Sequence, residues 1–129
     1  MHSSFPIVSI VIPTYNREQF LSRALMSVVG QSFTSWEAIV VDNYSEDNTE
    51  QVIEDFGDSR IKLFKIHNRG TIAASRNLGI KTSTGKWIAF LDSDDWWSPK
   101  KLERSMKFLN SGADIVYHDL FIVKKESQK

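Results

Sequence analysis

The sequence contains no cysteine, which excludes disulfides, thiolate metal sites and thiol nucleophiles. It has no excess of either charge, because sixteen basic and sixteen acidic side chains cancel. No net field therefore draws the protein onto nucleic acid, and we expect no nucleic-acid partner. It also lacks an apolar run near the ~20 residues of a spanning helix, and its N-terminus lacks the basic and apolar regions of a signal peptide. We expect a cytoplasmic protein, either free or peripheral to the inner face of the membrane.

What the chain does have is enough apolar material for one folded domain. Hydrophobic residues make up 41% of its 129 residues, and a chain of this length can bury about two thirds of its unfolded surface. No internal repeat or low-complexity stretch divides it. We predict a single domain over residues 1–129.

The pattern of apolar residues predicts alternating strands and helices. Short apolar runs predict strands at residues 7–12, 37–41, 61–65, 87–91 and 115–123. Apolar stripes predict helices at residues 18–29, 48–56 and 71–81, and Ser98-Pro99 is typical of a fourth helix start. This alternation implies a doubly wound, mostly parallel α/β sheet with helices on both faces. Pro13 is expected to end the first strand, and the third strand is expected near an edge.

Charge is patterned along the chain although its sum is zero. Seven acids and no base lie between residues 42 and 58, and seven bases and no acid between residues 60 and 91. Such blocks are typical of solvated faces, and for these two that interpretation stays open beside a functional one. Asp92, Asp94 and Asp95 differ, because they directly follow an apolar strand and their mutual repulsion would be relieved by a cation. The triplet is a candidate metal site.

The predicted sheet places three polar segments at one edge. Ligands of such sheets bind outside the carboxyl ends of the strands. The first strand leads into PTYNR at 13–17, the second into DNYS at 42–45 and the fourth into DSDD at 92–95. Hydroxyls, tyrosine rings, amides and carboxylates are therefore expected to meet at one crevice.

The residue types at this edge suit a nucleotide diphosphate and a divalent cation. In extended backbone, residues two apart point to one side, so Asp92 and Asp94 can address one Mg²⁺ or Mn²⁺ ion that also binds phosphates. Asp42 can accept a hydrogen bond from a base N–H or a ribose hydroxyl, and Tyr15 or Tyr44 can stack on a flat base. The sequence has neither a glycine-rich dinucleotide motif nor a Walker-type phosphate motif.

Structural interpretations of the same residues stay open. Asp42 can merely terminate a turn, and residues 14–16 can be only a helix entry with Asn16 as the cap. Arg76 is either a solvated helix residue or a phosphate clamp. The sequence favours packing for the tryptophans, and structural roles for the lone imidazoles, at Trp87, Trp96, Trp97, His67 and His118.

Four spaced segments resemble family 2 glycosyltransferases of GT-A fold. They are VSIVIPTYNRE at 8–18, LSRALMSVVGQSF at 21–33, EAIVVDNYSEDNT at 37–49 and NRGTIAASRNLGIKTSTGKWIAFLDSDDWWSPKKLE at 68–103. The likeness covers about residues 7–123. It implies an inverting, metal-dependent transferase that moves a sugar from a nucleotide diphosphate, often a UDP-sugar, to a glycan or lipid-linked acceptor in polysaccharide biosynthesis.

By motif position, the resemblance implies nucleotide-binding roles for five residues. Thr14 and Tyr15 resemble first-loop contacts to the nucleoside. Asp42 resembles the aspartate that recognises the uracil ring. Asp92 matches the first acid of the Asp-X-Asp motif, near the ribose, and Arg76 a helper near the nucleotide phosphates.

The resemblance also implies the catalytic groups. Asp94 matches the aspartate on a Mn²⁺ or Mg²⁺ ion, with Asp92 beside it and Asp95 as an adjacent acid whose role varies. The cation would neutralise the leaving diphosphate. An inverting displacement also needs a general base. No residue is assigned that role, and Asp119, near the end of the fifth predicted strand, is a poor substitute.

The sequence departs from the resemblance in two respects. Residues 43–45 are Asn-Tyr-Ser where the family commonly has a glycine, so we expect a changed turn and an altered base pocket. Family members also commonly extend further, through a part that carries the acceptor site and the base. We therefore expect the chain to supply donor and metal binding only. We also expect exposed apolar surface around the fourth and fifth strands, and hence self-association.

Two other classes of function compete with a transferase. A non-catalytic nucleotide-sugar-binding or assembly module would retain the fold for partner contacts, and the intact Asp-X-Asp pattern argues against it. A receiver-like signalling domain gathers acids after the first strand and a phospho-accepting aspartate after the third. Here the acids follow the second and fourth strands instead, so we take the transferase interpretation forward.

Overall fold

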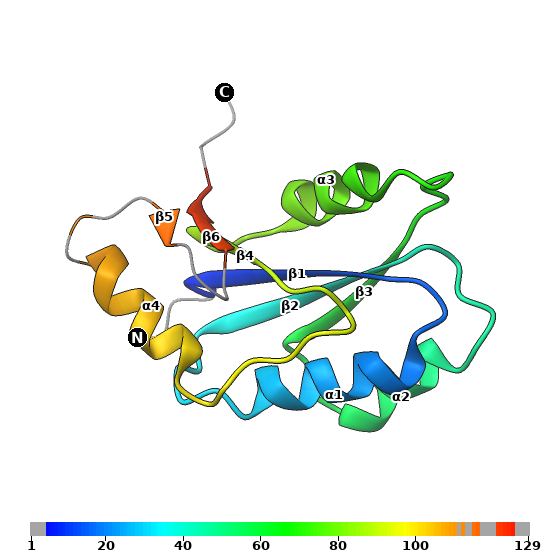
Figure 1. Ribbon diagram of the computed structural model, residues 1–129, viewed down its shortest axis with the longest axis horizontal. Coiled ribbons are helices and arrows are strands. Elements are labelled where there is room, and N and C mark those ends of the chain that lie inside the picture. The colour runs from blue at the N-terminus through cyan, green and yellow to red at the C-terminus, as the bar shows by residue number, and fades with distance from the viewer. Residues whose placement is uncertain (1–4, 111, 113–114, 117–120, 126–129) are drawn as a thin grey trace.

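A computed structural model describes residues 5–110, 112, 115–116 and 121–125 of the chain. Strands and helices alternate along most of it, and Figure 1 shows α1 and α2 on one face of the sheet with α3 on the other. The strands are β1 (Val8–Thr14), β2 (Trp36–Asp42), β3 (Ile61–Lys65), β4 (Trp87–Phe90), β5 (Ile115–Val116) and β6 (Phe121–Lys124). The helices are α1 (Glu18–Val29), α2 (Thr49–Phe56), α3 (Ile72–Thr82) and α4 (Lys101–Asn110).

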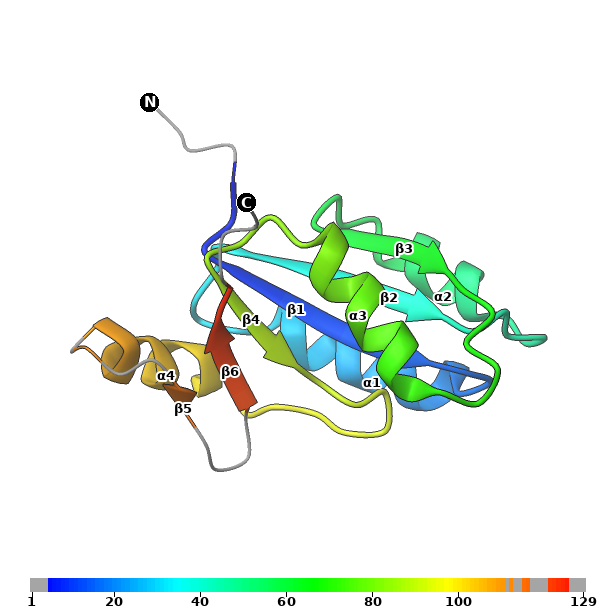
Figure 2. The ribbon, with the colours of Figure 1, turned by 90° about the horizontal axis from the view of Figure 1, so that it is seen from above.

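The sheet confirms the predicted fold class. Its strand order is β3-β2-β1-β4-β6-β5, with parallel pairing from β3 through β4. Strand β3 lies at the edge, as predicted. Strand β6 runs antiparallel to β4, and β5 antiparallel to β6, so the sheet is mostly parallel (Figure 2). The order differs from the 2-1-3-4-5 arrangement of receiver domains, and the receiver interpretation has no support.

Pro13 does not end the first strand, contrary to the prediction, because β1 continues to Thr14. The carbonyl of Val11 points toward β4 and accepts a hydrogen bond from the N–H of Leu91 at 3.0 Å. Backbone groups two residues apart on a strand point to the same side. The N–H that Pro13 lacks would therefore face the side where β4 has already ended at Phe90. The proline costs the sheet no ladder hydrogen bond.

Two further element predictions were wrong near the C-terminus. Residues 115–123 do not form one strand, because the short strands β5 and β6 pair with each other within that range. Helix α4 begins at Lys101 rather than at Ser98-Pro99. The carbonyls of Ser98 and Pro99 instead accept hydrogen bonds from the side chain of Gln31 and the N–H of Ser32, at 2.7 and 2.8 Å.

The main core lies between the sheet and α1. Helix α1 matches its predicted span, and its buried side chains follow the helical period at Leu21, Ala24, Leu25 and Val28. Alternate residues of β1, Val8, Ile10 and Ile12, belong to the same buried cluster. The other face of β1 packs against α3, and Gly79 permits a close approach to Val11 there.

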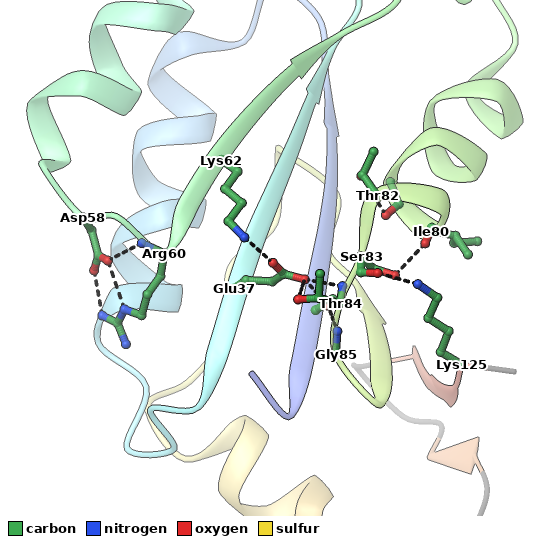
Figure 3. Close-up of polar contacts among 12 residues, drawn as sticks. Glu37, Asp58, Arg60, Lys62, Ile80, Thr82, Ser83, Thr84, Gly85 and Lys125 are labelled. Carbon is green, nitrogen blue, oxygen red and sulfur yellow. Dashed lines mark hydrogen bonds and ion pairs between the residues drawn. The ribbon is translucent and has the colours of Figure 1, made fainter. Parts of the chain in front are cut away.

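A buried polar network ties the amino ends of the strands together. The carboxylate of Glu37, in β2, is 2% exposed and accepts hydrogen bonds from Lys62 at 2.8 Å and Ser9 at 2.5 Å. Thr84, in the segment before β4, donates both its N–H and its hydroxyl to the same carboxylate (Figure 3). Burial raises the pKa of Glu37, but these hydrogen bonds outweigh it and leave the pKa below its ordinary value. The network therefore fixes four segments at the end of the sheet opposite the predicted crevice.

The expected apolar surface around the fourth and fifth strands is tested only in part, because the side chains of the fifth predicted strand other than Ile122 lie outside the described residues. Trp87, Ile88 and Ala89 of β4 are buried, and Phe90 is half-buried. Large exposed apolar side chains include Trp96 in the segment after β4, Phe108 on α4, and Phe20 and Met26 on α1. Self-association stays a prediction. None of the helices in the described part of the chain combines the length and apolar character needed to cross a membrane.

Candidate nucleotide and cation site

A pocket of about 320 Å³ opens at the carboxyl ends of β1 and β2. The register of the sheet places Thr14 and Asp42 opposite each other on the last rung of the β1–β2 ladder. The loops after β1, β2, β3 and β4 and the first turn of α3 supply its walls, and the sheet-edge argument predicted the loops after β1, β2 and β4. The lining residues are Pro13, Thr14, Tyr15, Arg17, Asn43, Asn68, Gly70, Ile72, Ser75 and Ser93.

Thr14, in the wall of the pocket, has a buried hydroxyl without a hydrogen-bond partner among the described residues. The residue is 6% exposed. Leaving such a group unpaired costs about 1–3 kcal/mol, which a ligand hydrogen bond would recover. Tyr15 follows with its ring half exposed, at 50%. The two residues thus offer a polar group and a flat apolar surface to the same pocket.

Asp42 is held by the turn that follows it. The carboxylate is 1% exposed, and its Oδ1 atom accepts hydrogen bonds from the N–H and the hydroxyl of Ser45, at 3.1 and 2.5 Å. Asn16 donates its N–H to the Ser45 hydroxyl and accepts the N–H of Glu46 on its side chain. The prediction of Asn16 as the cap of α1 is therefore wrong, because its amide joins the loops after β1 and β2. Asp42 therefore terminates a turn, and it lines a second hollow of about 260 Å³ with Ser45 and Asp47 rather than the first pocket.

The turn after β2 has a left-handed residue that is not a glycine. Tyr44 has a φ of +47°, a conformation that glycine favours. The expectation of a changed turn and an altered base pocket stays a prediction. The ring of Tyr44 stacks on His67, which gives that imidazole a structural partner.

Two arginines hold the carboxylates of the Asp-X-Asp loop. Arg76, on α3, lies 3.5 Å from Asp92, and Arg17, before α1, lies 3.5 Å from Asp94. Arg23 adds a hydrogen bond to the backbone carbonyl of Asp94 at 3.4 Å. Arg76 therefore pairs with a predicted site residue rather than standing free in solvent. Each carboxylate of the Asp-X-Asp pair therefore has a guanidinium group beside it.

The donor set fits a hard divalent cation that also takes ligand oxygens. Asp92 and Asp94 present carboxylate oxygens, which Mg²⁺ and Mn²⁺ prefer. The Asp95 carboxylate accepts a hydrogen bond from the N–H of Trp96 at 2.8 Å. Across the described ranges, no three histidine or acidic side chains are arranged to hold a metal ion by themselves. A cation here would need further oxygens, such as those of a diphosphate.

Sequence reasoning missed part of the pocket wall. Asn68 donates its N–H to the side chain of Asn43 and its amide NH₂ to Ser75, both at 2.9 Å. The Asn-Arg-Gly turn at 68–70 was the available signal, because such turns often serve binding loops. The contacts join residues 25 and 7 positions apart, which no local pattern reveals.

Of the four tryptophans, Trp36, Trp87 and Trp97 are buried and Trp96 is exposed. Trp87 and Trp97 are 5% and 3% exposed, which confirms the packing interpretation for both. Trp96 is 54% exposed, and the Arg23 guanidinium lies 4.0 Å from its ring centroid. His118 and Asp119 lie outside the described residues.

A mostly parallel α/β sheet with this pocket and an Asp-X-Asp loop at its carboxyl edge defines a glycosyltransferase of the GT-A class. TarS from S. aureus, solved as residues 1–349, superposes with a TM-score of 0.76 and 31% identity over 81% of this chain and 32% of its own. It has also been solved in complex with UDP and with UDP-GlcNAc. The mannosyltransferase PcManGT from Pyrobaculum calidifontis, solved with GDP-Man and Mn²⁺, has a TM-score of 0.79 at 19% identity, over 95% of this chain and 45% of its own. That second likeness shows the shared fold.

The chain belongs to glycosyltransferase family 2, because the model of that family, Glycosyl transferase family 2, matches residues 9–129. The Escherichia coli protein WfgD, named UDP-Glc:alpha-D-GlcNAc-diphosphoundecaprenol beta-1,3-glucosyltransferase, is 38% identical over 94% of this chain and 48% of its own length. TuaG of Bacillus subtilis, a putative teichuronic acid biosynthesis glycosyltransferase, is 35% identical over 81% of this chain and 42% of its own. The chain thus spans about half the length of these curated relatives.

Proposed function

We propose that this chain forms the donor and cation site of an inverting glycosyltransferase that uses a UDP-sugar. One observation carries the proposal: the pocket at the carboxyl edge is lined by Thr14 and Tyr15 after β1, Asn43 after β2 and Ser93 of the Asp-X-Asp loop. The UDP complex of TarS, 31% identical to this chain, supports the choice of nucleotide.

The nucleoside is assigned to the loops after β1 and β2. Asp42 accepts a hydrogen bond from the base N–H, and Tyr15 packs its exposed ring against the base. The hydroxyl of Thr14 gains the partner that it lacks in the free chain. Asp92 lies near the ribose, and Arg76 balances charge on the diphosphate.

The cation is assigned to Asp94 and Asp92, with Asp95 as an adjacent acid. A divalent cation bound there, Mn²⁺ or Mg²⁺, supplies positive charge that stabilises the leaving diphosphate. In the free chain, Arg17 and Arg76 neutralise the two carboxylates. The same guanidinium groups can pair with phosphate oxygens when the nucleotide enters, so charge stays balanced throughout binding.

The acceptor is assigned by class only. The name of the E. coli relative specifies a diphosphoundecaprenol-linked sugar, and that of the B. subtilis relative specifies teichuronic acid biosynthesis. These names support a glycan or lipid-linked acceptor in polysaccharide biosynthesis. Inverting transfer also needs a base opposite the leaving group, and we assign none to the described residues.

Calorimetric titration of UDP, with and without Mn²⁺, tests the proposal. We expect binding that strengthens with Mn²⁺, and an Asp94→Ala variant that loses the metal-dependent part, by about tenfold or more. Met26→Ala, at an exposed position of α1, is the matched control and should bind as the unmodified chain does. Absence of UDP binding in both metal conditions would overturn the proposal and favour a non-catalytic assembly module.

A further inference from the structure

The turn after β2 holds a tyrosine in a strained conformation next to the proposed base-binding carboxylate. A residue with a Cβ is disfavoured at the +47° φ of Tyr44. Such strain persists only where surrounding contacts fix it, and it concentrates at functional sites. The contacts of Tyr44 therefore show what holds this turn in place.

Two contacts fix the turn against the loop after β3. The ring of Tyr44 stacks on the imidazole of His67, with centroids 3.9 Å apart and planes 9° from parallel. On the next residue of the β3 loop, the N–H of Asn68 donates to the side chain of Asn43 at 2.9 Å. We call these two contacts the loop clamp. Tyr44 is 45% exposed, so burial alone does not explain the stack.

The loop clamp affects two groups of residues near the pocket. On one side, the left-handed turn at Tyr44 brings the N–H and hydroxyl of Ser45 back onto Asp42 Oδ1. On the other side, Asn43 and Asn68 line the pocket directly. Tyr44, His67 and Asp42 are not among its lining residues, and Asp42 lines a second hollow together with Ser45. The effect of Tyr44 and His67 on a ligand therefore passes through the residues that they hold.

We propose that Tyr44 and His67 are positioning residues that set nucleobase affinity and selectivity by fixing the direction of the Asp42 carboxylate. This inference rests on the proposed function of the site. A fixed carboxylate accepts the N3–H of uracil, whereas cytosine presents an acceptor at N3 and repels it. If the turn is released, the Asp42 carboxylate can move away from the base. The affinity for uracil then falls, and so does the discrimination between uracil and cytosine.

Calorimetry with UDP and CDP in the presence of Mn²⁺ tests the loop clamp. We expect His67→Ala and Tyr44→Ala each to raise the Kd for UDP by about three- to tenfold and to leave the Kd for CDP nearly unchanged. Tyr44→Phe keeps the ring and should retain the affinity and selectivity of the unmodified chain. The double variant Tyr44→Ala/His67→Ala should bind no worse than the weaker single variant, because both remove one contact.

Three results would count against the inference. If both single variants bind UDP as the unmodified chain does, the loop clamp has no positioning role. If UDP and CDP weaken by the same factor, the stack supports the fold without aiming Asp42. A far-ultraviolet circular dichroism spectrum of each variant separates this case from loss of folding. If the unmodified chain binds no UDP, the proposed function itself fails, and the loop clamp with it.

Discussion

Asp92 and Arg76 form an ion pair of 3.5 Å that joins the loop after β4 to α3, beside the pocket at the carboxyl edge of the sheet. Asp94 and Arg17 form a second pair of the same length. All four side chains are between 41% and 61% exposed, so the pairs contribute little to stability. Their rearrangement on ligand binding therefore costs little, which suits residues that exchange one charged partner for another.

Arg76→Gln should weaken UDP binding while leaving uridine binding unchanged. The substitution removes a guanidinium that can pair with the diphosphate, and charged hydrogen bonds of this kind are worth about 1.5–3 kcal/mol. We expect the Kd for UDP to rise by about tenfold or more in a calorimetric titration. Uridine carries no phosphate and serves as the internal control. An equal loss for both ligands would place Arg76 at the nucleoside instead.

Gly79→Ala should destabilise the fold by a steric clash with Val11. A Cβ at residue 79 would lie 2.4 Å from Val11 Cγ1, and overpacking of this kind costs about 1–3 kcal/mol. In a Val11→Ala background the opposing methyl groups are gone, so the same substitution should cost about 1 kcal/mol less. Urea unfolding of the four proteins in this cycle measures the coupling. If the losses of unfolding free energy from the two substitutions are strictly additive, Val11 and the new methyl group do not clash, and α3 has moved away from β1.

The stability of the protein should fall in acid through Glu37. Its pKa is lowered in the folded state, because hydrogen bonds from Lys62, Ser9 and Thr84 outweigh the effect of burial. A lowered pKa means that ionisation favours folding. The stabilisation is therefore complete above the ordinary pKa of 4.5 and is lost as the pH falls through the folded-state value.

Glu37→Gln isolates this contribution. At neutral pH we expect the variant to lose about 1–3 kcal/mol of unfolding free energy in urea. The gap to the unmodified chain should narrow as the pH falls below 4.5, because the unmodified carboxylate then becomes protonated as well. Glu54→Gln, at an exposed position of α2, is the control and should change little. A gap that is constant with pH would exclude the ionised carboxylate as its source.

Local patterns were sufficient for most of the fold. The apolar stripe of α1 predicted the helix residue for residue, because amphipathic periodicity extends over its whole length. The left-handed Gly57 ends α2 at Phe56, the last residue of the predicted helix. The boundary between β5 and β6 was missed, because the polar residues His118 and Asp119, which interrupt the apolar residues of 115–123, were interpreted as part of one strand.

At the site, the sequence could not predict contacts between residues that lie far apart along the chain. The position of Thr14 opposite Asp42, on the last rung of the β1–β2 ladder, followed from the rule that parallel strands end at one edge. The pairing of Asp94 with Arg17 joins residues far apart in sequence, and no spacing rule predicts it. Tyr44 shows the same limit, because its stacking partner His67 comes from the loop after the next strand.

Amide NMR with Mn²⁺ as a paramagnetic probe tests the central claim most directly, since it locates the cation in the chain. With UDP present, we expect the amide signals of Ser93 and Asp94 to broaden first. Signals of Glu37 and Lys62, at the opposite end of the sheet, should stay sharp, and Mg²⁺ should broaden none. Asp94→Ala should abolish the local effect. Broadening centred on the acidic segment at 47–54, whether or not UDP is present, would contradict the account.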